Sequence, residues 1–453
     1  GLYIALANGH TNTVMEFTNS ILNSTTLNPQ QKIELLAAKG PKGFPELYTA
    51  LKNGNIKIVT VVTNFILNST TLNLQQKIEL LSAKSHEDFP GLYIALANGH
   101  TNTVMEFTNS ILSATTLTSQ HQAELLSAKC PQGFPGLYIA LANGHTNTVM
   151  EVTNSILSAT TLTSQQQVEL LSAKCSKGYS GLYAALEKGH TDTITTFTES
   201  ILSATRLNPQ HQAELLAAKS HKGYSGLYMA LAKGHTNTVM AFTNSILKST
   251  RLTSQQQAEL LAAQLPNGYS GLHAALANGD TKTVTAFTNS ILSTTKLNPQ
   301  QQVELLSAKC SKGYSGLYAA LEKGHTNTVM AFINSILKST RLTSQQQAEL
   351  LSAKCSKGFP WLYTALAKGH TNTVMAFTNS VLNSTTLNSQ QQVELLSAKC
   401  SKGYSGLYAA FENGHTDTIT AFTESILSAT TLNWQQKIEL LSSIPMSNAM
   451  ILP

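Results

Sequence analysis

A single interval of 45 residues organises this chain, because a Gly-His pair or a close variant returns at that spacing without one insertion or deletion. The glycine of each pair stands at Gly9, Gly54, Gly99, Gly144, Gly189, Gly234, Gly279, Gly324, Gly369 and Gly414. A constant period of this length is typical of stacked repeat proteins, in which each unit covers the apolar face of the next. Such an array offers a long surface instead of one deep catalytic pocket.

Composition agrees with a folded repeat array. Apolar residues make up 42% of the chain, which is enough for a core, whereas charged residues make up only 12%, about half the usual share. The net charge of +6 is small for 453 residues and does not itself indicate nucleic-acid or membrane binding. No apolar run approaches the roughly 18 residues of a membrane-spanning helix. We expect one tandem-repeat solenoid domain over residues 1–453, belonging to a larger protein because the chain opens inside a repeat.

The fifth repeat, residues 181–225, predicts three helices. Ser180 is a natural N-cap for a short first helix, and Gly189 occupies a C-cap position. A second helix is expected from Thr191 to about Ala204, with apolar residues at helical spacing. The third follows an Asn-Pro pair, with Pro209 at its first position, and is expected to end at Lys219. No segment alternates like a strand, so the predicted fold class is all-α.

The opening of this repeat carries a family resemblance. The segment Gly178-Tyr179-Ser180-Gly181-Leu182-Tyr183-Ala184-Ala185-Leu186, followed by Gly189-His190, resembles the start of an ankyrin repeat. The resemblance implies an α-solenoid that binds proteins. Ankyrin units have 33 residues, so twelve residues here are additional, and they place a third helix where ankyrin repeats have their β-turn. An armadillo- or HEAT-like solenoid therefore stays an alternative.

The repeated sequence motif is also similar to repeats in bacterial type III secretion effectors of the enterotoxin-like class. Gly-Leu-Tyr-x-Ala-Leu-x-x-Gly-His, with Glu-Leu-Leu-x-Ala-Lys between copies, carries this similarity. It implies a virulence effector whose repeats bind a host protein. We accordingly expect a cytoplasmic protein, or one that a bacterium secretes into the host cytosol.

Three columns of repeated residues resemble sites and are interpreted as structural. The histidines, such as His145, are one repeat apart, too far to share a zinc ion that needs ligands at about 2 Å. The glutamates, from Glu34 to Glu439, are expected to bond the adjacent unit's backbone or a lysine. The cysteines are expected to be small, reduced packing residues, because stacking at roughly 8–10 Å exceeds disulfide reach; they are Cys130, Cys175, Cys310, Cys355 and Cys400.

Residues that depart from the repeat are better candidates for partner binding. One position that is mostly threonine becomes basic in repeats 5 to 8, at Arg206, Arg251, Lys296 and Arg341. Neighbouring units should align these side chains, either as a solvated face or as a partner-binding row. Trp361 replaces a glycine at the start of a first helix, and exposed aromatic residues are common interface anchors. Local packing is the alternative for Trp361.

These observations predict a protein–protein interaction scaffold. The sequence contains no P-loop, dinucleotide-binding, zinc-protease or hydrolase motif, so we expect no catalysis, cofactor or metal, and a monomer whose partner is a protein. The alternatives are a nucleic-acid-binding helical array, which the low charge disfavours, and a module that positions an enzymatic domain outside this chain. The last residues, 444–453, are expected to cap the apolar end of the array.

Overall fold

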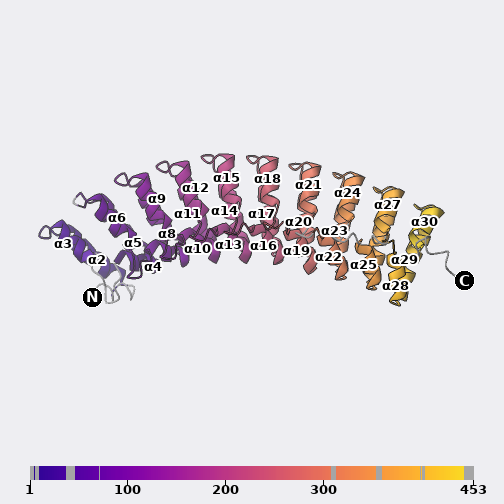
Figure 1. Cartoon of the computed structure of the whole chain (residues 1–453). Helices are drawn as coiled ribbons and strands as arrows, with labels where there is room; N and C mark the ends of the chain where they lie inside the picture. Colours follow the sequence, from indigo (N-terminus) through magenta and orange to yellow (C-terminus); the bar gives the residue numbers. More distant parts are fainter. Residues whose placement is uncertain are drawn as a thin grey trace. The chain divides into compact units, whose positions relative to one another are not determined.

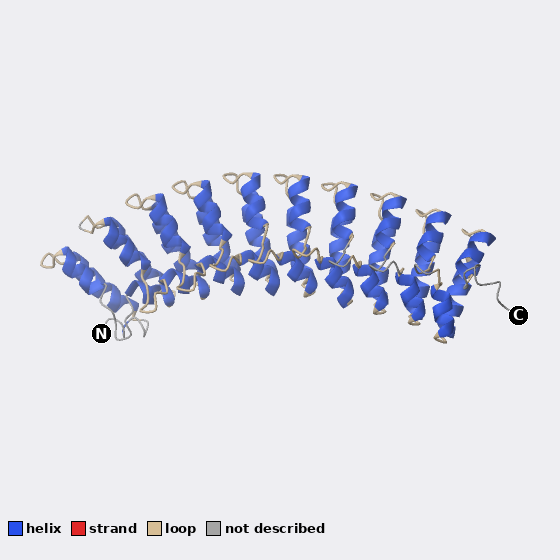
Figure 2. Ribbon diagram, in the orientation of Figure 1, coloured by secondary structure: helices blue, strands red, loops and turns tan. Residues whose placement is uncertain are grey.

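The computed structural model describes residue 5 and residues 10–36, 46–70, 72–307, 313–352, 360–397, 399 and 403–442. Throughout this part of the chain, regular secondary structure is helical and no strand occurs (Figure 2). The all-α prediction is therefore confirmed. The expected cap at residues 444–453 lies outside the described residues.

The chain forms two compact units, residues 1–222 and 223–453. Figure 1 shows how helices of one kind recur in each unit. In unit 1 the first helices are α4 (Glu46–Lys52), α7 (Gly91–Ala97), α10 (Gly136–Asn143) and α13 (Gly181–Lys188). The second helices are α2 (Thr11–Asn23), α5 (Ile56–Asn68), α8 (Thr101–Ser113), α11 (Thr146–Ser158) and α14 (Thr191–Ser203). The third helices are α3 (Pro29–Leu36), α6 (Leu74–Ser82), α9 (Ser119–Ser127), α12 (Ser164–Ser172) and α15 (Pro209–Leu216).

Unit 2 repeats the pattern. Its first helices are α16 (Gly226–Ala232), α19 (Gly271–Asn278), α22 (Gly316–Glu322), α25 (Trp361–Ala367) and α28 (Gly406–Glu412). Its second helices are α17 (Thr236–Lys248), α20 (Thr281–Ser293), α23 (Thr326–Leu337), α26 (Thr371–Leu382) and α29 (Thr416–Ser428). Its third helices are α18 (Ser254–Leu261), α21 (Pro299–Leu306), α24 (Ser344–Leu351), α27 (Ser389–Leu396) and α30 (Trp434–Leu441). Within each unit, like helices of successive repeats pack together, as expected for a solenoid.

The predicted caps define the helix ends in repeat 5. The Ser180 side chain accepts a hydrogen bond from the backbone N–H of Tyr183, and Gly189 ends α13 with φ of +78°. Helix α14 ends at Ser203, one residue before the predicted end. Helix α15 stops at Leu216, three residues earlier than Lys219. That boundary was wrong because the chain turns at Ala217 to enter the next repeat, a tertiary effect that a periodic pattern does not report.

The loop between a third helix and the next first helix keeps a hairpin-like turn without forming a strand. The backbone N–H of Cys175 donates to the carbonyl of Tyr179 at 3.0 Å, and the N–H of Gly178 donates to the carbonyl of Cys175 at 2.8 Å. The equivalent loops contain isolated antiparallel bridges, such as Lys84 with Pro90. Successive turns also bond each other, since the Ser176 N–H donates to the Gly133 carbonyl at 3.1 Å.

A buried glutamine joins the second and third helices of most repeats. Gln167 is fully buried, and its Nε2 donates to the carbonyls of Ile156, Leu157 and Ala159 at 2.8, 3.3 and 3.2 Å. Because these carbonyls lie at the C-terminal end of α11, where few intrahelical donors remain, the amide helps to cap the helix. Lys77 performs this role in the second repeat, donating to the Leu67 carbonyl at 2.9 Å.

Candidate functional site

The most promising concave feature lies between consecutive third helices. In unit 1 a pocket of about 440 Å³ opens between α9 and α12. Its floor is apolar and includes Leu96, Leu137 and Ile156. The exposed carboxylates of Glu124 and Glu169 stand on its helical walls. This volume falls in the usual range of binding pockets.

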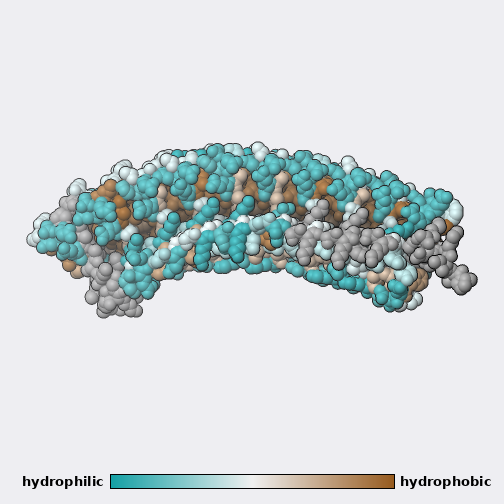
Figure 3. Space-filling view, viewed as in Figure 1, coloured by the Kyte–Doolittle hydropathy of each residue, from teal (hydrophilic) through white to brown (hydrophobic). Residues whose placement is uncertain are grey.

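Unit 2 contains the same pocket five repeats further along the chain. It has a volume of about 540 Å³ and lies between α24 and α27. Ala348, Glu349 and Ser352 line it at the repeat positions that Ala123, Glu124 and Ser127 hold in unit 1. The pocket therefore recurs at equivalent positions of the two units. Figure 3 shows apolar patches recurring between polar borders on one face of the repeats.

One wall position sets the width of this groove. This position is Ala123 in the unit 1 pocket and Ala348 in the unit 2 pocket. Two further copies also carry alanine, at Ala213 and Ala258, and the others carry valine or isoleucine, as in Val303 and Ile78. Because alanine occupies less space than valine or isoleucine, the residue at this position affects the width of the groove. Sequence reasoning missed it, although the alternation of small and β-branched residues beside the unchanged Gln30 and Glu34 columns is visible in the sequence.

Trp361 lies in the wall of the unit 2 pocket and packs locally, which is one of the two interpretations that the sequence left open. Only 2% of it is exposed, and its ring centre lies 4.1 Å from that of Phe377 in an edge-on arrangement at 77°. Trp361 is buried because the first residue of a first helix faces the preceding repeat. At Gly136, for example, a Cβ atom would lie 2.4 Å from Leu96 Cδ1.

Two of the four basic residues bond to backbone carbonyls of the preceding repeat. Arg206 lies in unit 1, where its Nη1 donates to the carbonyl of Ala159 and its Nη2 to that of Leu162 at 3.4 Å. In unit 2, Arg341 Nη2 donates to the carbonyl of Leu297 at 3.1 Å. Both guanidinium groups thus join their own repeat to the preceding one. Arg251 is half-buried and Lys296 is exposed, and both belong to unit 2.

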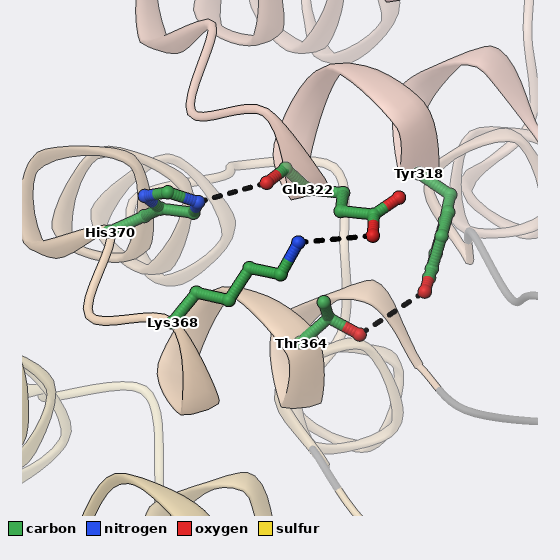
Figure 4. Close-up of polar contacts among 5 residues, drawn as sticks. All are labelled: Tyr318, Glu322, Thr364, Lys368 and His370. Atoms are coloured by element: carbon green, nitrogen blue, oxygen red, sulfur yellow. Dashed lines mark hydrogen bonds and ion pairs between the residues drawn. The ribbon is translucent and has the colours of Figure 1, made fainter. Parts of the chain in front are cut away.

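The histidine column joins successive repeats, which confirms its structural interpretation. His145 Nε2 donates to the Ala97 carbonyl at 2.8 Å in unit 1. In unit 2, His370 donates to the Glu322 carbonyl at 2.9 Å, beside an ion pair of 3.0 Å between Lys368 and Glu322 (Figure 4). Within the described ranges, no three His, Cys, Asp or Glu residues are placed to hold a metal ion.

The same contact explains the Gly-His pair. Gly99 has φ of +71°, which favours glycine, and a Cβ there would lie only 2.7 Å from His145 Nδ1. The ring of one repeat therefore rests on the glycine of the preceding repeat. Where His is replaced, as at Asp280, the carboxylate accepts from the N–H of Thr283 at 3.2 Å and caps the second helix instead.

The remaining columns have structural roles, one of them different from the role expected. Glu169 Oε1 accepts from Gln165 Nε2 at 3.3 Å, and Glu259 accepts from Gln255 at 2.9 Å. The predicted bond to the adjacent backbone or a lysine is therefore wrong, since the Gln one turn earlier is the partner. Cys130 and Cys175 are buried free thiols, as expected; Cys310, Cys355 and Cys400 lie outside the described residues.

A buried carboxyl group was not anticipated. Glu46 occupies the same repeat position as Trp361 and Gly136, is 5% exposed, and has no hydrogen-bond partner for either carboxylate oxygen among the described residues. Burial raises its pKa from 4.5 to about 8, because desolvation disfavours the charged form. The substitution of Glu for Gly is visible in the sequence, but its burial follows only from the stacking.

These features define the class as an all-α repeat solenoid with a groove between its third helices. No family model matches the chain, and no curated protein matches it. Among matching solved structures is the crystal structure of the ankyrin repeat domain of Bcl-3, a member of the IkappaB protein family. It is 17% identical, covers 60% of this chain and 91% of its own, and has a TM-score of 0.40. At this identity and TM-score the similarity carries no conclusion about function.

No helix in the described part of the chain is both long and apolar enough to cross a membrane.

Proposed function

We propose that this chain is a protein–protein interaction scaffold that binds its partner in the groove between the third helices. The recurrence of one pocket at equivalent positions in both units carries the proposal. Each pocket combines apolar side chains with polar groups on the walls, the usual composition of a recognition site. Catalysis is not proposed, because the polar columns are engaged in helix capping and in bonds between repeats.

The five residues that stood out in the sequence keep a place in this proposal. Trp361 forms a wall of the unit 2 pocket, where it would contact a bound side chain. Arg206, Arg251, Lys296 and Arg341 would add a second contact at the loops before the third helices. Because Arg206 and Arg341 each use part of the guanidinium group to bond a backbone carbonyl, fewer of their donors remain for phosphates, which favours a protein partner over a nucleic acid.

At a finer level, we propose that the chain is the target-binding repeat region of a bacterial effector, acting as a monomer on a host protein in the cytosol. The similarity of the repeated sequence motif to repeats of type III effectors supports this assignment. The buried free thiols of Cys130 and Cys175 agree with a reducing compartment. In that setting the array would position an enzymatic domain or a target outside these residues.

A peptide-display selection tests the scaffold. A phage library of disordered protein segments is selected on the intact chain, and enriched peptides are measured against Ala123→Ile/Ala348→Ile. Isoleucine occurs naturally at this repeat position, as in Ile78, so the variant should fold. It narrows both pockets, and we expect affinity to fall about tenfold or more, the equivalent of about 1.4 kcal/mol.

The matched control is Ser113→Ile/Ser293→Ile, two exposed residues at the ends of second helices. We expect the control to bind within about twofold of the parent chain. Selected peptides that bind the narrowed and parent chains equally would contradict the proposed site.

A further inference from the structure

Basic side chains gather at one edge of unit 2, where second helices are joined to third helices in three consecutive repeats. Figure 2 shows the loops between second and third helices along one border of the repeats. The side chains belong to the loops α17–α18, α20–α21 and α23–α24, and they are Lys248 and Arg251, Lys296, and Lys338 and Arg341. The three lysines are exposed and the two arginines are half-buried. We call these five residues the basic edge.

The three loops are neighbours, because the helices that they join pack against their equivalents in the next repeat. Helix α17 packs on α20 and α20 packs on α23, and α18, α21 and α24 follow the same order. Arg341 Nη2 donates to the carbonyl of Leu297 at 3.1 Å, so the loop of repeat 8 contacts the residue that follows Lys296. At helix-packing distance, the cations of successive loops lie roughly 8–10 Å apart.

Neighbouring carboxylates do not balance the positive charge of the basic edge. Helices α17, α20 and α23 contain no acidic residue, and each third helix that follows carries one glutamate, in its last turn. Within the described ranges, no ion pair joins Lys248, Lys296 or Lys338 to a carboxylate. Arg341 bonds a neutral carbonyl, which satisfies one donor and leaves its positive charge in place.

The repeat does not require cations at these positions. Other copies carry neutral residues there, such as Ser113 at the position of Lys248 and Thr116 at the position of Lys296. The second helices of unit 1 even have the opposite charge, since α8 carries Glu106. The lysines of the basic edge are therefore a local feature of repeats 6 to 8 and not a structural requirement of the fold.

An acidic protein segment is a better match to this edge than a nucleic acid. Carboxylates three residues apart on an extended chain are separated by about 10 Å, which agrees with the spacing of the loops. Surfaces that bind single-stranded nucleic acids usually stack bases on aromatic side chains. Residues 248–257, 293–302 and 338–347 contain no aromatic residue. The edge thus offers charge without a platform for bases.

We propose that the basic edge binds an acidic segment of a partner protein, with carboxylates about three residues apart against Lys248, Lys296 and Lys338. Arg251 and Arg341 add positive charge beside them. None of these five residues lines the unit 2 pocket, so the edge is a second contact beside the groove. The inference rests on the proposed scaffold function and specifies the chemistry of the partner.

The test uses a fluorescein-labelled peptide of five Glu-Ser-Thr triplets and a matched peptide with glutamine in place of glutamate. Binding to the intact chain is measured by fluorescence anisotropy at about 50 mM NaCl, where charges are weakly screened. We expect the glutamate peptide to bind at least about tenfold more tightly than the glutamine peptide. Equal affinity for the two peptides would overturn the proposal.

A protein variant locates the contact. Lys248→Ser/Lys296→Thr/Lys338→Ser gives each position the residue that other copies carry, as in Ser113 and Thr116, so the variant should fold. We expect it to bind the glutamate peptide at least about tenfold more weakly than the parent chain does.

The matched control removes the same charge near the start of the same three second helices, about 20 Å away along each helix. It is Lys233→Asn/Lys282→Asn/Lys323→Asn, and asparagine occurs at these repeat positions in other copies, as in Asn98 and Asn102. We expect the control to bind the glutamate peptide within about twofold of the parent chain. Equal losses in both variants, or none in either, would overturn the proposal.

Two other results would assign the edge to a different occupant and overturn the proposal. One is a labelled single-stranded or duplex DNA that binds more tightly than the glutamate peptide and loses affinity in the Lys248, Lys296 and Lys338 variant. The other is self-association of the chain in analytical ultracentrifugation that the same variant abolishes. If the peptide test fails while display-selected peptides still depend on Ala123 and Ala348, the scaffold stands and the acidic-segment assignment falls.

Discussion

The pockets of unit 1 and unit 2 differ chiefly at one position of the repeat. In unit 1 that position is Gly136, and the first helix lies close against Leu96 of the preceding repeat. In unit 2 it is Trp361, which fills the equivalent space and forms a pocket wall. Near Trp361, α22 and α25 pack less closely than α25 and α28. One residue at the contact between stacked repeats can therefore change the shape of a groove while the three-helix structure of the repeat stays the same.

The largest effect should come from removing Trp361. Trp361→Ala deletes a buried ring that packs on Phe377, and large-to-small substitutions of this kind cost about 3–5 kcal/mol. Urea unfolding followed by circular dichroism measures the loss of free energy of unfolding. The matched control is Trp434→Ala, since Trp434 is 69% exposed and should change stability by less than about 0.5 kcal/mol. Equal losses of the free energy of unfolding in the two variants would contradict a packing role specific to Trp361.

Glu46 extends the comparison to a third residue at the same position. Its folded pKa of about 8 exceeds the ordinary 4.5, so the protonated carboxyl favours folding at low pH and that contribution is lost as pH rises from about 4.5 to 8. Glu46→Gln should stabilise the chain at pH 8 by on the order of 2–4 kcal/mol and leave it nearly unchanged at pH 4. Thermal melts at both pH values measure this. Exposed Glu79→Gln is the control, and a pH-independent gain would contradict the burial of a carboxyl group.

The buried glutamines test whether the pocket walls are otherwise equivalent. Gln392 Nε2 donates to the Val381 carbonyl at 3.1 Å, as Gln167 does to Ile156 in unit 1. Gln167→Ala and Gln392→Ala should each cost about 1–3 kcal/mol, because each leaves helix-terminal carbonyls unpaired. Exposed Gln165→Ala serves as the control. Clearly unequal losses in hydrogen-exchange protection of α11 and α26 would show that the units differ beyond the Gly136 and Trp361 position.

The smallest effect on stability should come from the histidine column, which bonds each repeat to the preceding one. His145→Ala and His370→Ala each remove one hydrogen bond to a carbonyl of the preceding repeat, worth about 1 kcal/mol. Similar shifts in the urea midpoint for both variants would support a histidine contact between repeats that contributes equally in the two units. A tenfold change in peptide affinity from either variant would instead place the histidines in the binding site.

Much of the local structure could be predicted from the sequence, because caps and apolar spacing act within one helix. Ser180, Gly189 and Pro209 each marked a helix end that the structure contains. Contacts between repeats could not be predicted in this way. The hydroxyl pair of Thr101 and Thr148, at 2.7 Å, and the buried position of Trp361 depend on how one repeat rests on the next.

The same limit applied to the candidate site. In the sequence, the residues repeated at one position of every unit made histidine and glutamate the most noticeable site candidates. The pocket, however, depends on Ala123 and on the space between α9 and α12. The basic residues were recognised correctly as departures from the repeat. The bonds of Arg206 and Arg341 to backbone carbonyls could not be predicted, because a guanidinium group long enough to reach solvent is also long enough to reach the carbonyls of the preceding repeat.

Hydrogen exchange on the intact chain, with and without a display-selected peptide, tests the central claim most directly. The account predicts new protection in the third helices that line the groove, α9 and α12 in unit 1 and α24 and α27 in unit 2. Protection confined to the first helices and their turns, with the third helices unchanged, would contradict it.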